Sequence, residues 1–205
     1  NFYLDVIKDR LYCGDDAGRA SAQSALYAIL SGMTRLIAPI LAFTSDEIWG
    51  MMAHAKGENA ESVLLNDMPD YDPALVLSEA DSDRWARLLA LRDDVNKALE
   101  LARESGVKKN QDAQVTLWLD AEHYAAWEAG TLLPGFDEAD LATLCIVSKV
   151  EVRSGKGEGY ASEVTPGLTV AVALSQAPKC PRCWNHDEGI GQDADHPELC
   201  PRCAA

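Results

Sequence analysis

The chain has 205 residues, of which 47% are hydrophobic and 25% are charged, and its formal net charge is −15. This is the composition of an ordinary globular protein, and the length suits one or two domains. The sequence contains no apolar run of about 18 residues and no secretory signal pattern, so we expect neither a membrane span nor secretion.

The acidic charge is unevenly spread. Residues 44–83 carry ten acidic residues and one basic residue, whereas residues 84–109 carry seven basic and four acidic residues, a local charge of +3. The overall excess of acid argues against a general nucleic-acid-binding protein. Only residues 84–109 and the basic residues near the C-terminus offer an RNA phosphate a favourable field.

Three amphipathic helices are predicted at the start of the chain. Residues 1–13 place apolar side chains on one side at helical spacing, and the pattern begins at once with Asn1, so we expect part of a longer chain. A second helix is expected over Arg19–Leu36, ended or kinked by Pro39. Residues 44–47, Thr-Ser-Asp-Glu, read as a capping box that opens a third helix. The three apolar stripes can be buried only against one another, which predicts a bundle.

Residues 56–73 show no hydrophobic period and are predicted to be an exposed connection. The helical period resumes over residues 78–105. The basic side chains on the outer face of that helix are Arg84, Arg87, Arg92, Lys97 and Arg103. We favour a solvated helix face with pairs such as Asp83–Arg87. The alternative is a track for an RNA backbone.

After Gly106 the pattern becomes mixed. Three strands are expected at residues 114–119, 146–153 and 168–174, and two short helices at residues 121–129 and 137–145. The glycine-rich stretch at residues 155–159 lacks the spacing and the following Lys-Ser or Lys-Thr of a phosphate-binding loop. A small α/β unit is therefore predicted after the helices.

The last 27 residues contain two C-x-x-C pairs that are separated by sixteen residues. The pairs are Cys180 with Cys183 and Cys200 with Cys203. Two such pairs at this spacing indicate a zinc site, because each turn directs two thiolates at one point and two turns complete a tetrahedron with metal–sulfur distances of about 2.3 Å. Four protein ligands leave no position for a substrate or water, so the zinc is expected to be structural.

Alternatives to zinc are weaker. Two disulfides need an oxidising compartment, whereas six cysteines without a secretory signal indicate a reducing cytoplasm. An iron–thiolate site has the same ligands and stays open. His186 and His196 lie between the pairs and offer an alternative to a thiolate ligand, but with four cysteines present we expect them to be solvated loop residues. Cys13 and Cys145 lie in apolar patterns typical of core residues. A segment this short has almost no core, so metal binding is expected to supply most of its folding free energy.

Motifs that carry catalysis are absent from the sequence. It contains no dinucleotide-binding, Walker, nucleophile-elbow or zinc-protease motif. The four histidines have no neighbouring nucleophile or paired carboxylate at a useful spacing. The residues alone therefore favour a binding or structural module.

Several stretches carry a family resemblance. FYLDVIKDRLYC, APILAFTSDEIW and the terminal KCPRCW…CPRC, in this order, closely resemble the C-terminal portion of bacterial isoleucyl-tRNA synthetases. LRDDVNKALELAR and LCIVSKVEV are similar to the junction region of that family. APILAFTSDEIW is shared with valyl and leucyl relatives, whereas the four-cysteine segment points to the isoleucyl enzymes. The resemblance covers essentially the whole chain, although GVKKNQD at residues 106–112 departs from the small-residue stretch expected there.

The resemblance implies a mainly α fold with a small α/β part. Residues 1–105 are expected to be a helical anticodon-binding bundle, residues 106–175 a small α/β junction domain, and residues 176–205 a zinc-binding tail. The parent protein is expected to be a cytoplasmic, monomeric class I aminoacyl-tRNA synthetase that uses ATP to attach isoleucine to its tRNA. The HIGH-type and KMSKS-type motifs and the editing domain are absent here, so the chain is expected to be inactive alone.

The same resemblance implies the partners and the site. The partners are isoleucine tRNA, through its anticodon arm, and the upstream catalytic domain of the same chain, with no membrane. One structural Zn²⁺ is expected on the four cysteines, while ATP is used outside this stretch. The implied RNA-binding residues are Lys179, Arg182, Trp184 and Arg202. Arg182 suits a phosphate, and Trp184 suits either a splayed base or packing beneath the zinc knuckle.

Two rival hypotheses come from other classes. The knuckle spacing also resembles the zinc finger that ends certain base-excision DNA glycosylases, although those enzymes start with a catalytic proline and glutamate, which Asn1 and Phe2 do not match. The other rival is an architectural role, in which the zinc tail and the bundle brace a larger enzyme. The dependence of tRNA binding on salt and on the anticodon discriminates between the RNA-binding and architectural hypotheses.

Overall fold

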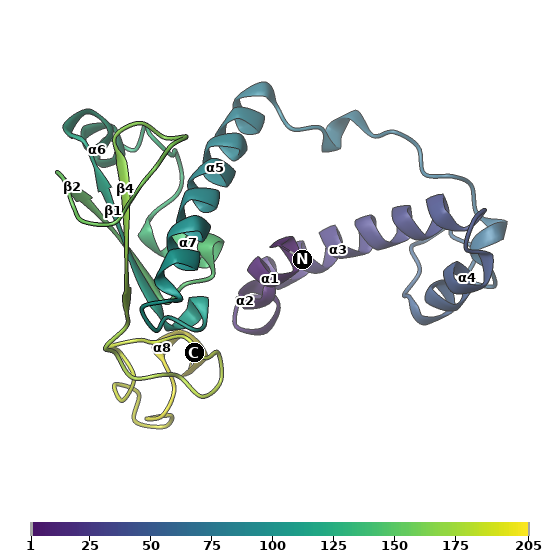
Figure 1. Cartoon of the computed structure of the whole chain (residues 1–205). Coiled ribbons are helices and arrows are strands. Elements are labelled where there is room, and N and C mark those ends of the chain that lie inside the picture. Colours follow the sequence, from purple (N-terminus) through teal and green to yellow (C-terminus); the bar gives the residue numbers. More distant parts are fainter. Residues whose placement is uncertain (1, 205) are drawn as a thin grey trace. The chain divides into compact units, whose positions relative to one another are not determined.

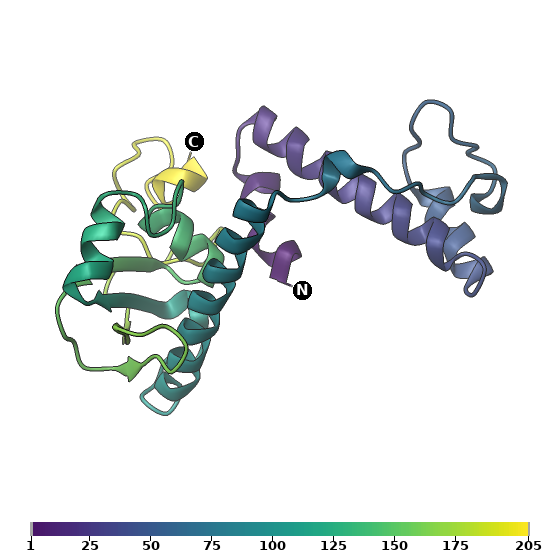
Figure 2. The same ribbon diagram turned by 90° about the horizontal axis from the view of Figure 1, so that it is seen from above.

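The computed structural model describes residues 2–204, and Asn1 and Ala205 lie outside the described residues. Contacts divide the chain into two compact units (Figure 1, Figure 2). One unit is Ile7–Val76, and the other joins the chain up to Val6 with the chain from Leu77 onward. Among the described residues, every helix is too short or too polar to cross a bilayer.

The unit Ile7–Val76 is helical. Its elements are α2 (Lys8–Tyr12), α3 (Asp16–Ile37), α4 (Ala42–Met51) and the 3₁₀ turns η1 (Val63–Leu65) and η2 (Pro73–Leu75). Helix α3 begins after Asp15, whose side chain accepts a hydrogen bond from the backbone N–H of Gly18, and it ends before Pro39 as the sequence predicts. Both α2 and α4 pack against α3. The predicted helix over residues 1–13 is divided into α1 (Phe2–Val6) and α2.

The capping box predicted at residues 44–47 is wrong. Helix α4 begins earlier, at Ala42, and has no side-chain cap. The carboxylate of Asp46 instead accepts hydrogen bonds from the hydroxyl of Ser62 at 2.6 Å and from the backbone N–H of Val63 at 3.1 Å. Because these groups lie at the start of η1, the polar side chain that resembled a cap for α4 anchors the following connection.

That connection is largely exposed, as predicted, but its first part is anchored through the partly buried Glu58. Glu58 accepts hydrogen bonds from the hydroxyl groups of Tyr27 and Ser31 on α3 and from the backbone N–H of Ala55. Burial opposes the ionisation of Glu58, but these hydrogen bonds outweigh it and lower the pKa of the carboxyl group. The first part of residues 56–73 is therefore attached to α3. The sequence of this connection has no hydrophobic period, so it gives no signal of that attachment.

The unit that contains the chain from Leu77 onward is built on a four-stranded mixed sheet. Its strands are β1 (Ala113–Leu119), β2 (Lys149–Ser154), β3 (Tyr160–Ala161) and β4 (Leu168–Leu174), in the order β2-β1-β4-β3. Strand β1 is parallel to β2 and antiparallel to β4. The starts of β1 and β2 and the end of β4 therefore lie at one edge of the sheet. The three longer strands confirm the predicted strands, whereas β3 is too short to show a pattern.

Helices complete this unit (Figure 2). They are α1, α5 (Glu79–Ala102), α6 (Ala121–Glu128), α7 (Glu138–Cys145) and α8 (Pro201–Ala204), with the turn η3 (Asn110–Asp112) before β1. Alternate residues of β1 are buried in one core with Leu88 and Val95 of α5 and Leu141 of α7. From its helical periodicity, α5 is predicted to belong to the N-terminal bundle. In the structure its apolar side packs against the sheet. The division into three domains at residues 105 and 175 stays a prediction.

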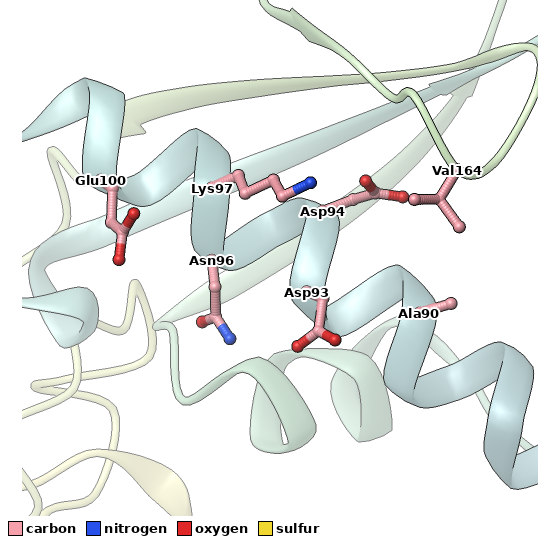
Figure 3. A pocket seen from close by; sticks show the side chains of 7 residues that line it. All are labelled: Ala90, Asp93, Asp94, Asn96, Lys97, Glu100 and Val164. Carbon is pink, nitrogen blue, oxygen red and sulfur yellow. The ribbon is translucent and has the colours of Figure 1, made fainter.

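Asp94 of α5 is a buried carboxylate that fixes the loop between β3 and β4. It is 1% exposed and accepts hydrogen bonds from the hydroxyl groups of Ser162 at 2.6 Å and Thr165 at 3.1 Å. The Ser162 hydroxyl in turn accepts from the backbone N–H groups of Val164 and Thr165. Figure 3 shows Asp94 directed toward the loop that carries Val164.

We predict that Asp94→Ala destabilises this unit by about 1–3 kcal/mol, because two half-buried hydroxyl groups lose their buried acceptor. The neighbouring Asp93 is exposed, so Asp93→Ala removes the same charge and is expected to change the stability by no more than about 0.5 kcal/mol. Urea unfolding of both variants provides the measurement. Equal losses for the two variants would contradict this account of the loop.

Candidate metal centre

The four cysteines of the C-terminal segment converge on one point. Their Sγ atoms all lie within 4.8 Å of one another, and the Sγ atoms of Cys183 and Cys200 are 3.7 Å apart. A tetrahedral Zn²⁺ with metal–sulfur distances of about 2.3 Å requires sulfur–sulfur edges of about 3.8 Å. The donor set and its geometry therefore fit one structural zinc ion, with no position left for a reacting group.

Backbone turns present the thiols. In the first knuckle the N–H of Trp184 donates to the carbonyl oxygen of Cys180 at 2.9 Å, and in the second the N–H of Cys203 donates to that of Cys200 at 2.9 Å. The guanidinium of Arg182 joins the knuckles, since its Nη1 donates to the Cys203 carbonyl oxygen at 2.9 Å.

Three of these cysteines are also the only buried residues within the described range 178–204. They are Cys180, Cys200 and Cys203, each 3% exposed or less. The segment thus has no apolar core of its own. A bound metal takes the place of that core, as expected for a fold whose stability comes from metal binding.

The protein environment shifts the pKa values of these thiols in different directions. Burial opposes the ionisation of Cys180, but backbone N–H groups, among them those of Cys183 and Cys200, outweigh it and lower the pKa of this thiol to about 6. Burial raises the pKa of Cys200, and burial with the neighbouring thiols raises that of Cys203. Zinc binding must therefore displace protons from the last pair. By contrast, Cys145 is a core residue, where burial raises its thiol pKa to about 12.

Ionic and hydrogen-bonded contacts hold the zinc segment on the sheet edge where β1 and β2 begin. The ammonium group of Lys179 pairs with the carboxylate of Asp112, and Nε2 of His186 lies 3.3 Å from the same carboxylate. The backbone N–H of His186 donates to the hydroxyl of Ser148 at 2.7 Å. The hydrogen bond from Lys179, helped by His186, lowers the pKa of Asp112.

This arrangement corrects one prediction and qualifies another. His186 is not a solvated loop residue, because its side chain is only 16% exposed and contacts the sheet edge; His196 is exposed as predicted. Lys179, predicted to bind RNA, uses its charge in the ion pair with Asp112. From sequence alone, a histidine or lysine beside a zinc knuckle that contacts the sheet cannot be distinguished from one that contacts RNA.

Trp184 has an unusual backbone conformation for a bulky residue. Its φ is +68°, in the left-handed region, and it is 53% exposed. The Lys109 ammonium group lies 4.8 Å from the centroid of its ring. A left-handed conformation costs a non-glycine residue about 1–2 kcal/mol. Backbone geometry at this position favours glycine, and the exposed ring gains little from burial.

The basic and polar side chains of α5 do not form a second cluster among the residues that the structure describes. On α5, Arg84 pairs with Asp81 at 2.7 Å, and Nε of Arg92 donates to the Leu144 carbonyl oxygen at 3.2 Å. A pocket beside this helix is lined by Ala90, Asp93, Asp94, Asn96, Lys97, Glu100 and Val164. Its polar side chains do not converge, as Figure 3 shows Asp94 and Glu100 pointing in different directions. The pocket therefore offers no arrangement for catalysis.

Comparisons with known proteins match both parts of the sequence. Residues 1–117 match the family model described as "Anticodon-binding domain of tRNA ligase". Residues 178–205 match the model described as "Zinc finger found in FPG and IleRS". The second match contains all four cysteines of the metal centre.

Curated relatives align with the full length of the chain. The isoleucine–tRNA ligases of Geobacter sulfurreducens and Syntrophotalea carbinolica are each 43% identical over 209 residues, which cover 100% of this chain and 21% of each relative. The isoleucine–tRNA ligase of Pectobacterium atrosepticum is 40% identical over 209 residues with the same coverage. The chain thus spans about a fifth of the length of these relatives.

We predict that Cys200→Ala releases the metal and unfolds residues 178–204 while the helices of Ile7–Val76 remain folded. Structural zinc sites have apparent binding free energies of about 10–16 kcal/mol, so the loss of one of four ligands is expected to weaken zinc binding by roughly a hundredfold or more. Zinc content and amide hydrogen exchange report the two effects. Cys13→Ala, which removes a cysteine outside the cluster, should retain one zinc per chain. An ordered C-terminal segment without metal would contradict the prediction.

Proposed function

The chain belongs to the family of anticodon-binding domains of tRNA ligases, and we propose that it is the tRNA-binding, C-terminal part of an isoleucine–tRNA ligase. The observation that carries the proposal is that the chain combines the anticodon-binding domain with the zinc finger and aligns over its full length with ligases of that name. The parent enzyme attaches isoleucine to its tRNA with ATP, in the cytoplasm and as a monomer.

Within that enzyme the chain supplies binding and not chemistry. It carries no catalytic motif, and the catalytic domain lies upstream in the same polypeptide. Gripping the anticodon arm holds the distant acceptor end of the tRNA at the active site. Phosphate contacts set the register of the RNA, and stacking or base-edge contacts read the splayed anticodon bases.

The glycosylase hypothesis is wrong. The zinc-finger model includes such proteins by its description, but residues 1–117 match a tRNA-ligase domain and the relatives reported above are isoleucine–tRNA ligases over the full chain. The shared C-x-x-C spacing reflects the geometry that zinc requires and carries no information about the nucleic acid that is bound.

In the proposed site, Cys180, Cys183, Cys200 and Cys203 are the zinc ligands. Bound zinc supplies a fixed link between the two knuckles and takes no part in a reaction, because its four positions are filled by protein. The cysteines thereby hold the chain on both sides of each knuckle in place for contact with RNA.

The proposed RNA contacts surround the first knuckle and α8. Trp184 stacks on an unpaired base, an interaction that its half-exposed ring supports. Arg182 uses the part of its guanidinium that Cys203 does not occupy to bind phosphate. Arg202, half-buried on α8, and Lys179 add positive charge beside them. Among these residues, Lys179 has the weakest support because of its ion pair with Asp112.

We predict that the zinc-loaded chain binds isoleucine tRNA and prefers the native anticodon over an altered anticodon by about tenfold or more, since hydrogen bonds to base edges discriminate against a wrong base by about 1–3 kcal/mol. Binding is expected to weaken as salt rises, because phosphate contacts release counterions. Fluorescence titrations with both tRNAs at two salt concentrations give the measurement. Equal affinities would restrict the chain to backbone binding, and an absence of binding would contradict the proposal and favour the architectural role.

A second prediction concerns Trp184→Gly. Glycine relieves the left-handed strain at this position. The variant is therefore expected to retain its zinc, and its free energy of unfolding is expected to stay within about 1 kcal/mol of the parent value. Loss of the stacking surface is expected to weaken tRNA binding by about tenfold. Zinc content, melting temperature and tRNA affinity are compared for the parent and variant. If the ring were chiefly a packing element, stability would fall together with affinity.

A further inference from the structure

We infer that Lys109, in the connection between α5 and β1, binds an RNA phosphate next to the base that lies against Trp184. This inference deepens the proposed function and rests on it. It extends the proposed RNA-binding surface from the zinc segment onto the connection between α5 and β1, within the same unit. The ligand is the phosphodiester of a single-stranded RNA segment.

The first support is the position of the ammonium group. Lys109 is exposed, and its Nζ lies 4.8 Å from the centroid of the Trp184 ring. This distance is within the range of about 6 Å over which a cation is attracted to an aromatic face. Since 53% of Trp184 stays exposed, the contact leaves surface for a base. A base stacked on that surface brings its backbone within reach of the long lysine side chain.

The second support is that the structure fixes where Lys109 lies relative to the zinc segment. Lys109 immediately precedes η3, which leads into β1. Asp112, at the end of η3, receives both Lys179 and His186 from the zinc segment. The contact between Lys109 and Trp184 is therefore adjacent to the ionic contacts that hold the segment on the sheet. The backbone at Lys109 is therefore held in a fixed position, which a residue that binds a ligand requires.

The third support is the charge of Lys109. Two other lysines of this unit are neutralised, since Lys149 pairs with Glu151 and Lys179 pairs with Asp112. None of the ion pairs found among the described residues involves Lys109. An aromatic face attracts an ammonium group without removing its hydrogen-bond donors from a phosphate. In a chain of net charge −15, this is a local point at which a phosphate meets a favourable field.

The test uses the full zinc-loaded chain and isoleucine tRNA, with affinity measured over a series of salt concentrations. Lys109→Gln removes the charge, Lys109→Arg keeps it, and Lys156→Gln is the matched control. Lys156 is also exposed but follows β2, at the opposite edge of the sheet from the zinc segment. Zinc content is measured for every variant to show that the metal centre is intact.

We expect Lys109→Gln to weaken binding about fivefold to tenfold and to reduce the slope of log affinity against log salt by about 0.7–0.9, the value for one lost phosphate contact. Lys109→Arg should retain the parent slope, and Lys156→Gln should leave affinity and slope unchanged.

Three results would overturn the inference. If Lys109→Gln and Lys156→Gln behave alike, Lys109 has no specific contact, while the proposed function stands. If Lys109→Gln loses affinity with an unchanged salt slope, the lysine orients the indole and does not meet a phosphate. If the parent chain binds no tRNA at any salt concentration, the proposed function fails and this inference fails with it.

Discussion

Four sulfur atoms within 4.8 Å of one another are stable as thiolates only around a cation. The C-terminal segment depends on this constraint because its only buried residues in the described range 178–204 are cysteines. Hydrophobic burial, which organises the sheet and its helices, is replaced here by metal coordination. The backbone conformation of Trp184 and the contact between Arg182 and Cys203 follow from the same closed knuckles.

The sheet determines where this metal-dependent segment lies. Alternation along β1 buries one face of the strand against α5 and α7, which fixes the edge at which β1 begins. Asp112 stands at that edge and receives Lys179 and His186. The carboxylate of Asp112 thus fixes the positions of Lys179 and His186, which come from the zinc segment. The proposed RNA surface is therefore a joint product of the strand pattern and the metal.

Sequence reasoning predicted the features that repeat or that require fixed chemistry. The two C-x-x-C pairs predicted the thiol cluster, because few arrangements other than a metal centre use them, and alternation predicted the three longer strands. Contacts between distant residues left no such signal. His186 and Asp112 meet across 74 positions, Asp46 anchors η1 instead of capping α4, and Lys109 reaches Trp184 from another part of the unit. Each of these side chains has several ordinary local roles, so only the fold selects among them.

The connectivity of the docking contacts has a kinetic consequence. Within the zinc segment every ligand is close in sequence, whereas the sheet pairs Ala113 with Leu174 and offers its edge only after that long-range pairing has formed. The groups that receive the segment, Asp112 and Ser148, precede it in the chain and are synthesised first. Folding of the zinc segment therefore includes a bimolecular step, the capture of a metal ion, whose rate depends on the supply of zinc. When zinc is scarce, chains with a finished sheet are expected to accumulate before the zinc segment is complete.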